Sequence, residues 1–226
     1  MEDLMLSPKE LRNAIYLDFE GEGKKRNGAI PLPHMAGLFR PNKKGKSGKY
    51  SCVFFKQNWK PVSNGISPAK CSAFEDFFLV LLKEVEEKDS SLIYWTMHED
   101  MILKKYLSSQ LYKRLEPRLF NLHPTARKYA NRRRIFGHQE SARNKSLENF
   151  FASMYQKRNP YPPFPLGAAE ACRRVDTACK KLSKWKHFSD KQKSYAKDLI
   201  AYNEGDCRST WLIAKRLGNF YEVTSK

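Results

Sequence analysis

The segment Ile15–Gly21, which reads I-Y-L-D-F-E-G, is an apolar run that carries two carboxylates one residue apart. Side chains alternate between the two faces of an extended strand, so Asp18 and Glu20 project from the same face, about 6–7 Å apart. The apolar residues project from the other face, into a core: Ile15, Leu17 and Phe19. Two like charges on one face of a buried strand are unfavourable unless a cation bridges them. The pattern therefore predicts a divalent-metal site, with two solvated charges at a strand end as the alternative.

A second pair of polar residues lies on a predicted helix over residues 196–217. Apolar residues at helical spacing define its buried stripe: Cys207, Trp211, Ala214 and Leu217. Tyr202 and Asp206 are four residues apart and therefore lie on one face of this helix. Gly205 costs about 1 kcal/mol in a helix interior, which indicates a close backbone approach beside Asp206. In the alternative interpretation, Asp206 pairs with a basic neighbour such as Arg208 at the surface, and Tyr202 packs in the core.

The chain is strongly basic, with 42 lysines and arginines against 24 acidic residues and a formal net charge of +18. Such an excess favours a polyanionic partner, and basic clusters with aromatic residues nearby suit single-stranded DNA or RNA. One basic stretch covers residues 173–186, and the residues that we predict to contact phosphates form three further clusters: Lys24, Lys25 and Arg26; Lys43, Lys44 and Lys46; Arg132, Arg133 and Arg134. Solvated surface charge is the alternative. An anionic membrane fits less well, because no basic amphipathic helix stands out.

The chain has no apolar run of the roughly 18 residues that a membrane span needs, and its beginning lacks a signal-peptide pattern. We therefore expect a cytoplasmic protein with no membrane partner. Its five cysteines are odd in number and form no C-x-x-C pair, which argues against zinc ligation and a disulfide framework. Cys172 and Cys179 are seven residues apart and are expected to line one buried helical face.

Periodicity along the chain alternates between strand and helix. The predicted strands cover residues 13–20, 34–40, 50–55, 92–95 and 117–122, and the predicted helices cover 73–87, 99–111, 145–156, 168–182 and 190–217. A turn at Asn42–Gly48 joins two strands as an antiparallel pair, and Leu79, Leu82 and Val85 are core positions of the first helix. Residues 159–165 form a rigid proline-rich loop. This order predicts one α/β domain over residues 1–226, with a mixed five-stranded sheet flanked by helices and a basic, helical C-terminal third.

Three segments in this order resemble the DEDD 3′–5′ exonuclease superfamily, which has the ribonuclease H-like fold. They are Asp18-x-Glu20, the strand-to-helix junction at residues 94–100, and Tyr202-x-x-x-Asp206. The chain is most similar to the branch of predicted ribonuclease H-like nucleases associated with RecB-type nucleases, in which the last motif reads Y-N-x-x-D-x-x-x-T. That motif is matched by Tyr202, Asn203, Asp206 and Thr210. The tyrosine subtype fits, since the histidine subtype needs a histidine where this chain has Ala201.

The resemblance implies a nuclease that cleaves DNA or RNA with two Mg²⁺ or Mn²⁺ ions. Four carboxylates would hold the ions: Asp18, Glu20, Glu99 and Asp206. Two such ions about 4 Å apart can activate the attacking water and stabilise the leaving oxygen. Tyr202 would orient that water, since a phenol with a reference pKa near 10 is a poor base. Asp100 is the alternative to Glu99 as the third acid. A catalytically inactive nucleic-acid-binding module of the same fold is the alternative function.

Overall fold

The computed structural model describes residues 6–23, 27–136, 146–155 and 166–224, with side chains as far as residue 219. The strands are β1 (Ile15–Glu20), β2 (Met35–Pro41), β3 (Gly48–Phe54), β4 (Ala69–Cys71), β5 (Leu92–Tyr94) and β6 (Leu119–Asn121). The α-helices are α1 (Pro8–Asn13), α2 (Lys60–Gly65), α3 (Phe74–Glu87), α4 (Met97–Tyr106), α5 (Ser109–Leu115), α6 (Leu122–Arg132), α7 (Leu147–Tyr155), α8 (Ala168–Lys181) and α9 (Asp190–Thr224). Short 3₁₀ turns cover Gln57–Trp59, Glu116–Arg118 and Trp185–His187.

The strands form one mixed sheet in the order β4-β3-β2-β1-β5-β6. The predicted antiparallel pairing of β2 with β3 is confirmed, and β1 pairs antiparallel with β2 and parallel with β5. The α/β prediction is therefore confirmed, but the count of five strands is wrong. The sixth strand, β4, pairs in parallel with β3 at the edge of the sheet. Its three residues are too few to show an alternating pattern.

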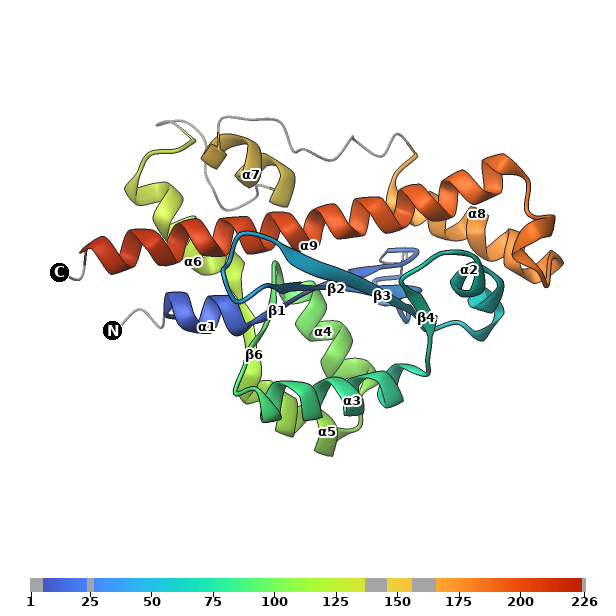
Figure 1. Cartoon of the computed structure of the whole chain (residues 1–226), viewed down its shortest axis with the longest axis horizontal. Helices are drawn as coiled ribbons and strands as arrows, with labels where there is room; N and C mark the ends of the chain where they lie inside the picture. The colour runs from blue at the N-terminus through green and yellow to red at the C-terminus, as the bar shows by residue number, and fades with distance from the viewer. Residues whose placement is uncertain (1–5, 24–26, 137–145, 156–165, 225–226) are drawn as a thin grey trace.

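Helices cover both faces of the sheet (Figure 1). On one face, α3, α4 and α5 pack against the apolar side of β1, where Ile15, Leu17 and Phe19 are buried as the alternation predicted. On the other face, α9 crosses β1 and β2 and is flanked by α6, α7 and α8. The helical C-terminal part of the prediction is confirmed by these four helices. None of the described helices has both the length and the apolar composition that crossing a bilayer requires.

The structure differs from the prediction at three places. The first strand begins at Ile15 rather than residue 13, because Ser7 and Glu10 form a capping box that starts α1. The predicted helix over 99–111 is two helices, interrupted where Leu107 is extended and the Ser108 amide donates to Glu75 of α3. On α3, Leu79 is 43% exposed rather than buried, while Phe78, Leu81, Leu82 and Val85 face the core.

The helix α9 packs directly on β2 at a position where the strand has a glycine. Gly37 pairs with Asp18, and a Cβ atom on Gly37 would lie 1.6 Å from Oδ1 of Asn203. The missing side chain thus makes room for a fully buried amide of α9. The buried stripe predicted on this helix is confirmed, since Cys207, Trp211, Ala214 and Leu217 are all buried. Cys172 and Cys179 are both buried on α8, as predicted.

Candidate metal centre

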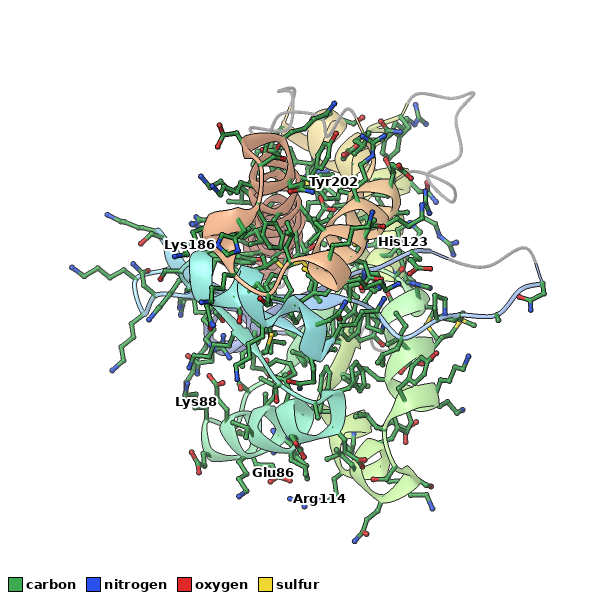
Figure 2. All side chains as sticks on the ribbon, turned by 90° about the vertical axis from the view of Figure 1, so that its right-hand side faces the viewer. Glu86, Lys88, Arg114, His123, Lys186 and Tyr202 are labelled. Carbon is green, nitrogen blue, oxygen red and sulfur yellow. The ribbon has the colours of Figure 1, made fainter. Side chains whose placement is uncertain are left out.

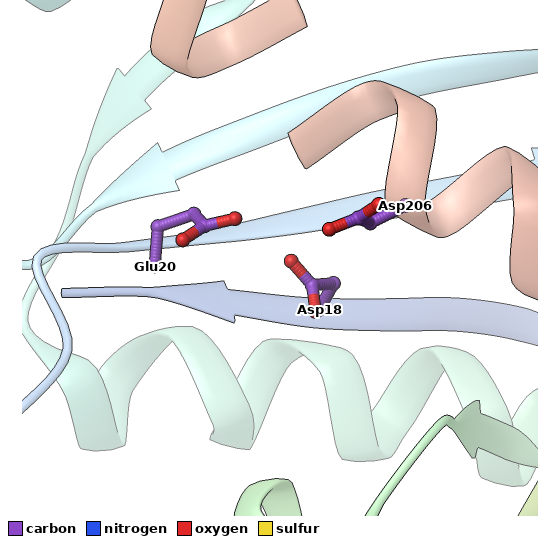
Figure 3. Close-up of side chains that lie close together, drawn as sticks. All are labelled: Asp18, Glu20 and Asp206. Atoms are coloured by element: carbon purple, nitrogen blue, oxygen red, sulfur yellow. The ribbon is translucent and has the colours of Figure 1, made fainter. Parts of the chain in front are cut away.

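Three carboxylates from two elements meet between the sheet and α9 (Figure 3). Asp18 and Glu20 project from β1, and Asp206 projects from α9; one oxygen from each lies within 4.8 Å of the others. Strand alternation puts the first two on the same face, and the docking of α9 over β1 brings the third. Glu20 and Asp206 are buried, and Asp18 is partly buried. Arg208, the expected surface partner of Asp206, pairs with Glu204 instead.

The electrostatics of this cluster favour a bound cation. Burial raises the pKa of Glu20 to about 8, and repulsion from Asp206 adds to the effect. Burial likewise raises the pKa of Asp206 to about 7. Burial and then repulsion from Glu20 hold the pKa of Asp18 well above its ordinary range. A divalent cation would relieve this repulsion, and a donor set made only of carboxylate oxygens fits Mg²⁺ or Mn²⁺.

Glu99 lies in the first turn of α4 and faces the cluster without belonging to the group of three. Its Oε2 accepts from the Thr96 amide at 3.0 Å and from the Thr96 hydroxyl at 2.9 Å, which completes a capping box. Repulsion from Glu99 contributes to the raised pKa of Asp18 and of Asp206. The side chain of Asp100 is held elsewhere, since it accepts a hydrogen bond from the Tyr112 hydroxyl at 2.9 Å. Of the two alternatives, Glu99 is the acid whose charge reaches the cluster.

Asn203 is a positioning residue whose role the sequence did not reveal. Its Nδ2 donates to Oδ2 of Asp18 at 2.6 Å, and its Oδ1 accepts from the hydroxyl of Tyr50 at 2.8 Å. The amide thus links β3, α9 and β1 in one buried chain of hydrogen bonds. The asparagine of the Y-N-x-x-D motif was a signal, but its partner could be known only once Gly37 was seen beneath it.

Two further side chains act on Asp206. A side-chain hydrogen bond from Tyr202 lowers the pKa of Asp206, although burial and repulsion from Glu148 outweigh it. Burial raises the pKa of Tyr202 itself above its usual value, so the phenol stays protonated at neutral pH and can donate. Glu148 is exposed on α7 and was not anticipated, because a single surface glutamate at a helix start carries no distinctive pattern.

A cavity of about 250 Å³ adjoins the cluster at Glu20. His98, at the start of α4, provides a second polar group in its wall. The rest of the lining is mostly apolar and comes from the end of β1, the segment before β2, α4 and the first turn of α8: Phe19, Ile30, Pro31, Pro33, Ile102, Ala168 and Ala169. The cavity thus has mostly apolar walls and reaches the cluster at Glu20.

The structure describes two of the three predicted phosphate-binding clusters, and these two lie on different elements. Lys24, Lys25 and Arg26 lie outside the described residues, as do Lys145 and the proline-rich loop at 159–165. Lys43, Lys44 and Lys46 lie on the β2–β3 turn, beyond Pro41, whereas Glu20 pairs with Met35 at the other end of β2. Six residues of strand separate these points, which is about 20 Å. Arg132, Arg133 and Arg134 are exposed at the end of α6.

In comparisons with known proteins, no family model, curated protein or solved structure matches the chain. Any assignment of function therefore depends on the site itself.

Proposed function

We propose that this chain is a metal-dependent nuclease that hydrolyses phosphodiester bonds of DNA or RNA. In its specific form, the proposal is a two-metal 3′–5′ exonuclease of the DEDD type, tyrosine subtype, with a ribonuclease H-like fold. The observation that carries it is the convergence of Asp18 and Glu20 from β1 with Asp206 from α9. These acids come from the two motifs that are specific for the superfamily. A mixed sheet flanked by helices, with β1 at its interior, supports the α/β part of the proposal.

The residues present fit the roles that this activity requires. Asp18, Glu20 and Asp206 would hold the metal, with Glu99 as the fourth acid. Divalent ions at such a site polarise the phosphate and lower the pKa of the attacking water. Asn203 holds Asp18 in one orientation through the 2.6 Å hydrogen bond. Tyr202 keeps its proton and is suited to orient a water beside Asp206.

The net charge of +18 supports a nucleic-acid substrate rather than a small phosphodiester. A surface that only bound nucleic acid would gain nothing from carboxylates facing phosphate. The acid cluster therefore favours catalysis over the inactive binding module.

The test is cleavage of end-labelled single-stranded DNA and RNA with and without Mn²⁺. A ladder that shortens from the 3′ end is expected, since this distinguishes exonuclease from internal cleavage. Asp18→Asn and Asp206→Asn should each lower the rate by about 100-fold or more, because metal ligation is worth several kcal/mol to the transition state. Asp198→Asn is the matched control: it is an exposed acid on the same helix, whose hydrogen bond from Ser194 an amide oxygen can also accept.

Both cluster variants should keep the wild-type circular dichroism spectrum. Near wild-type cleavage by either variant, or no metal-dependent cleavage of any substrate by the wild-type chain, would refute the proposal.

A further inference from the structure

A groove of about 540 Å³ lies between α8 and α9, close to the connection between the two helices. Its lining is rich in cations and polar groups, with one apolar residue, Ala178; the others are Glu170, Arg173, Arg174, Thr177, Lys181, Ser189, Lys191, Gln192 and Tyr195. In Figure 2, which looks onto this end of the molecule, α8 and α9 lie side by side, with Lys186 labelled near their connection and Tyr202 on α9. None of the three predicted clusters includes these residues.

The groove keeps an excess of positive charge after its internal ion pairs are formed. Arg173 and Arg174 both pair with the single carboxylate of Glu170, at 2.8 and 2.9 Å. Lys181 and Lys191 are exposed and form no ion pair with any of the described residues. Two free ammonium groups and a shared carboxylate make this groove a favourable surface for an anion with several charges.

The groove shares a helix face with the acid cluster. At 3.6 residues per turn, one narrow strip of α9 carries two residues of the groove and two of the candidate site: Lys191, Tyr195, Tyr202 and Asp206. From Lys191 to Asp206 this strip is about 22 Å long, at 1.5 Å per residue. The groove and the carboxylates therefore lie on the same side of α9, about 22 Å apart.

The first turn of α8 lies at the level where the strip on α9 approaches the acid cluster. Nη1 of Arg174 donates to the hydroxyl of Tyr195 at 2.6 Å, and the two helices run in opposite directions. Seven residues before Arg174 is Gly167, which directly precedes the first residue of α8. Because the helices are antiparallel, the same level on α9 is seven residues after Tyr195, at Tyr202. Beyond that level α8 no longer covers α9, and Asp206 lies one turn further along.

The helix α8, which forms one side of the groove, is bound to the 3₁₀ turn at Gln57–Trp59 through a buried carboxylate. Asp176 of α8 is buried and accepts hydrogen bonds from the indole of Trp59 at 3.0 Å and from Asn58 at 3.1 Å, and it pairs with Lys180 at 2.9 Å. Lys180 pairs with Asp176 within α8 and neutralises that buried carboxylate, whereas Lys181, its neighbour, is exposed and remains at the surface for a ligand.

We infer that the α8–α9 groove binds the phosphate backbone of a single-stranded nucleic acid whose end lies at the acid cluster. This inference rests on the proposed function, because it names where that substrate is held outside the cluster. Lys181 and Lys191 contact phosphates, so binding does not depend on base sequence.

The experiment measures binding rather than cleavage, in the Asp206→Asn protein with EDTA present. Fluorescence anisotropy gives Kd for labelled single strands of about 4, 8 and 16 nucleotides, the range of site sizes known for single-strand-binding folds. The test variant carries Lys181→Ala and Lys191→Ala. The control carries Lys83→Ala and Lys113→Ala, which remove the same charge from exposed positions on α3 and α5, across the sheet.

For the 16-nucleotide strand, the slope of log K against log salt should flatten by about 1.4 in the test variant, at 0.7 per lost phosphate contact. The slope should not change in the control variant. An unchanged slope for the longest strand, an equal loss in the control, or tighter binding of a 16-base-pair duplex than of the single strand would each overturn the inference. The two proposals fail separately, since cleavage with an unchanged slope refutes only the groove, and a flattened slope without cleavage refutes only the nuclease.

Discussion

Neutralising Asp206, as in Asp206→Asn, should stabilise the metal-free protein at neutral and alkaline pH, although it removes a carboxylate from the candidate site. The carboxyl is buried beside Asp18 and Glu20, and its pKa is raised from 3.8 to about 7. A folded-state pKa above the unfolded-state value means that the folded protein binds the proton more tightly. The stability that this group contributes is complete below about pH 4 and is lost as the pH rises through about 7.

The size of the effect follows from the two pKa values. A shift from 3.8 to about 7 is a free-energy difference of about 4 kcal/mol between the protonation states. Between pH 4 and 7, the wild-type protein should lose about 1.4 kcal/mol of stability per pH unit relative to Asp206→Asn. The variant also loses a charged hydrogen bond with Tyr202, which lowers its advantage to about 2 kcal/mol at pH 8. That advantage corresponds to a melting temperature higher by about 4–8 °C.

The assay is urea denaturation in EDTA at pH 5, 6, 7 and 8, with Asp198→Asn as the control. Asp198 is exposed, so its variant should follow the wild-type curve at every pH. A stability difference between wild type and Asp206→Asn that does not change with pH would refute the reasoning, because burial and the repulsion from Glu148 would then not raise the pKa of Asp206.

Three further outcomes are expected from the same geometry. Mn²⁺ or Mg²⁺ at 100 times its Kd should stabilise the folded protein by about 2.7 kcal/mol at pH 8. The stabilisation should be smaller at pH 5, where protons compete with the metal for the carboxylates. A chelator should reverse the shift in melting temperature, and a melting temperature that neither ion changes would count against the metal centre. Glu99→Gln should lose cleavage while Asp100→Asn keeps it, and the opposite result in the labelled-strand assay would assign the third acid to Asp100. Gly37→Ala should cost about 1–3 kcal/mol and weaken Mn²⁺ binding in titration calorimetry, because its methyl group would displace Asn203; a stable variant with unchanged affinity would contradict the close packing.

Those parts of the structure that depend on local periodicity were predictable from the sequence. The alternation in β1 put Ile15, Leu17 and Phe19 in the core and the acids on the opposite face. The helical spacing of apolar residues on α9 likewise predicted that Trp211 and Leu217 are buried. Two separate faces were thus known, but only a resemblance to known nucleases suggested that they meet.

Features that depend on tertiary contacts were not predictable from pattern alone. The break between α4 and α5 depends on Glu75, a residue of another helix, which binds the Ser108 amide. Leu79 fits a helical repeat, yet the packing of α3 on the sheet leaves it at the surface. The hydrogen bond between Asn203 and Asp18 requires the register of β2, which puts glycine at position 37.

The acid cluster is built from segments at opposite ends of the described chain, and this has a consequence for protein synthesis. Asp18 and Asn203 are 185 positions apart. At about 5–20 residues per second, a ribosome adds Asn203 roughly 10–40 s after Asp18. Throughout that interval, the growing chain carries the two acids of β1 but neither the carboxylate nor the amide of α9. Under the proposed function, the growing chain is inert beside the messenger RNA that encodes it, and it becomes competent only after α9 has emerged and docked on the sheet.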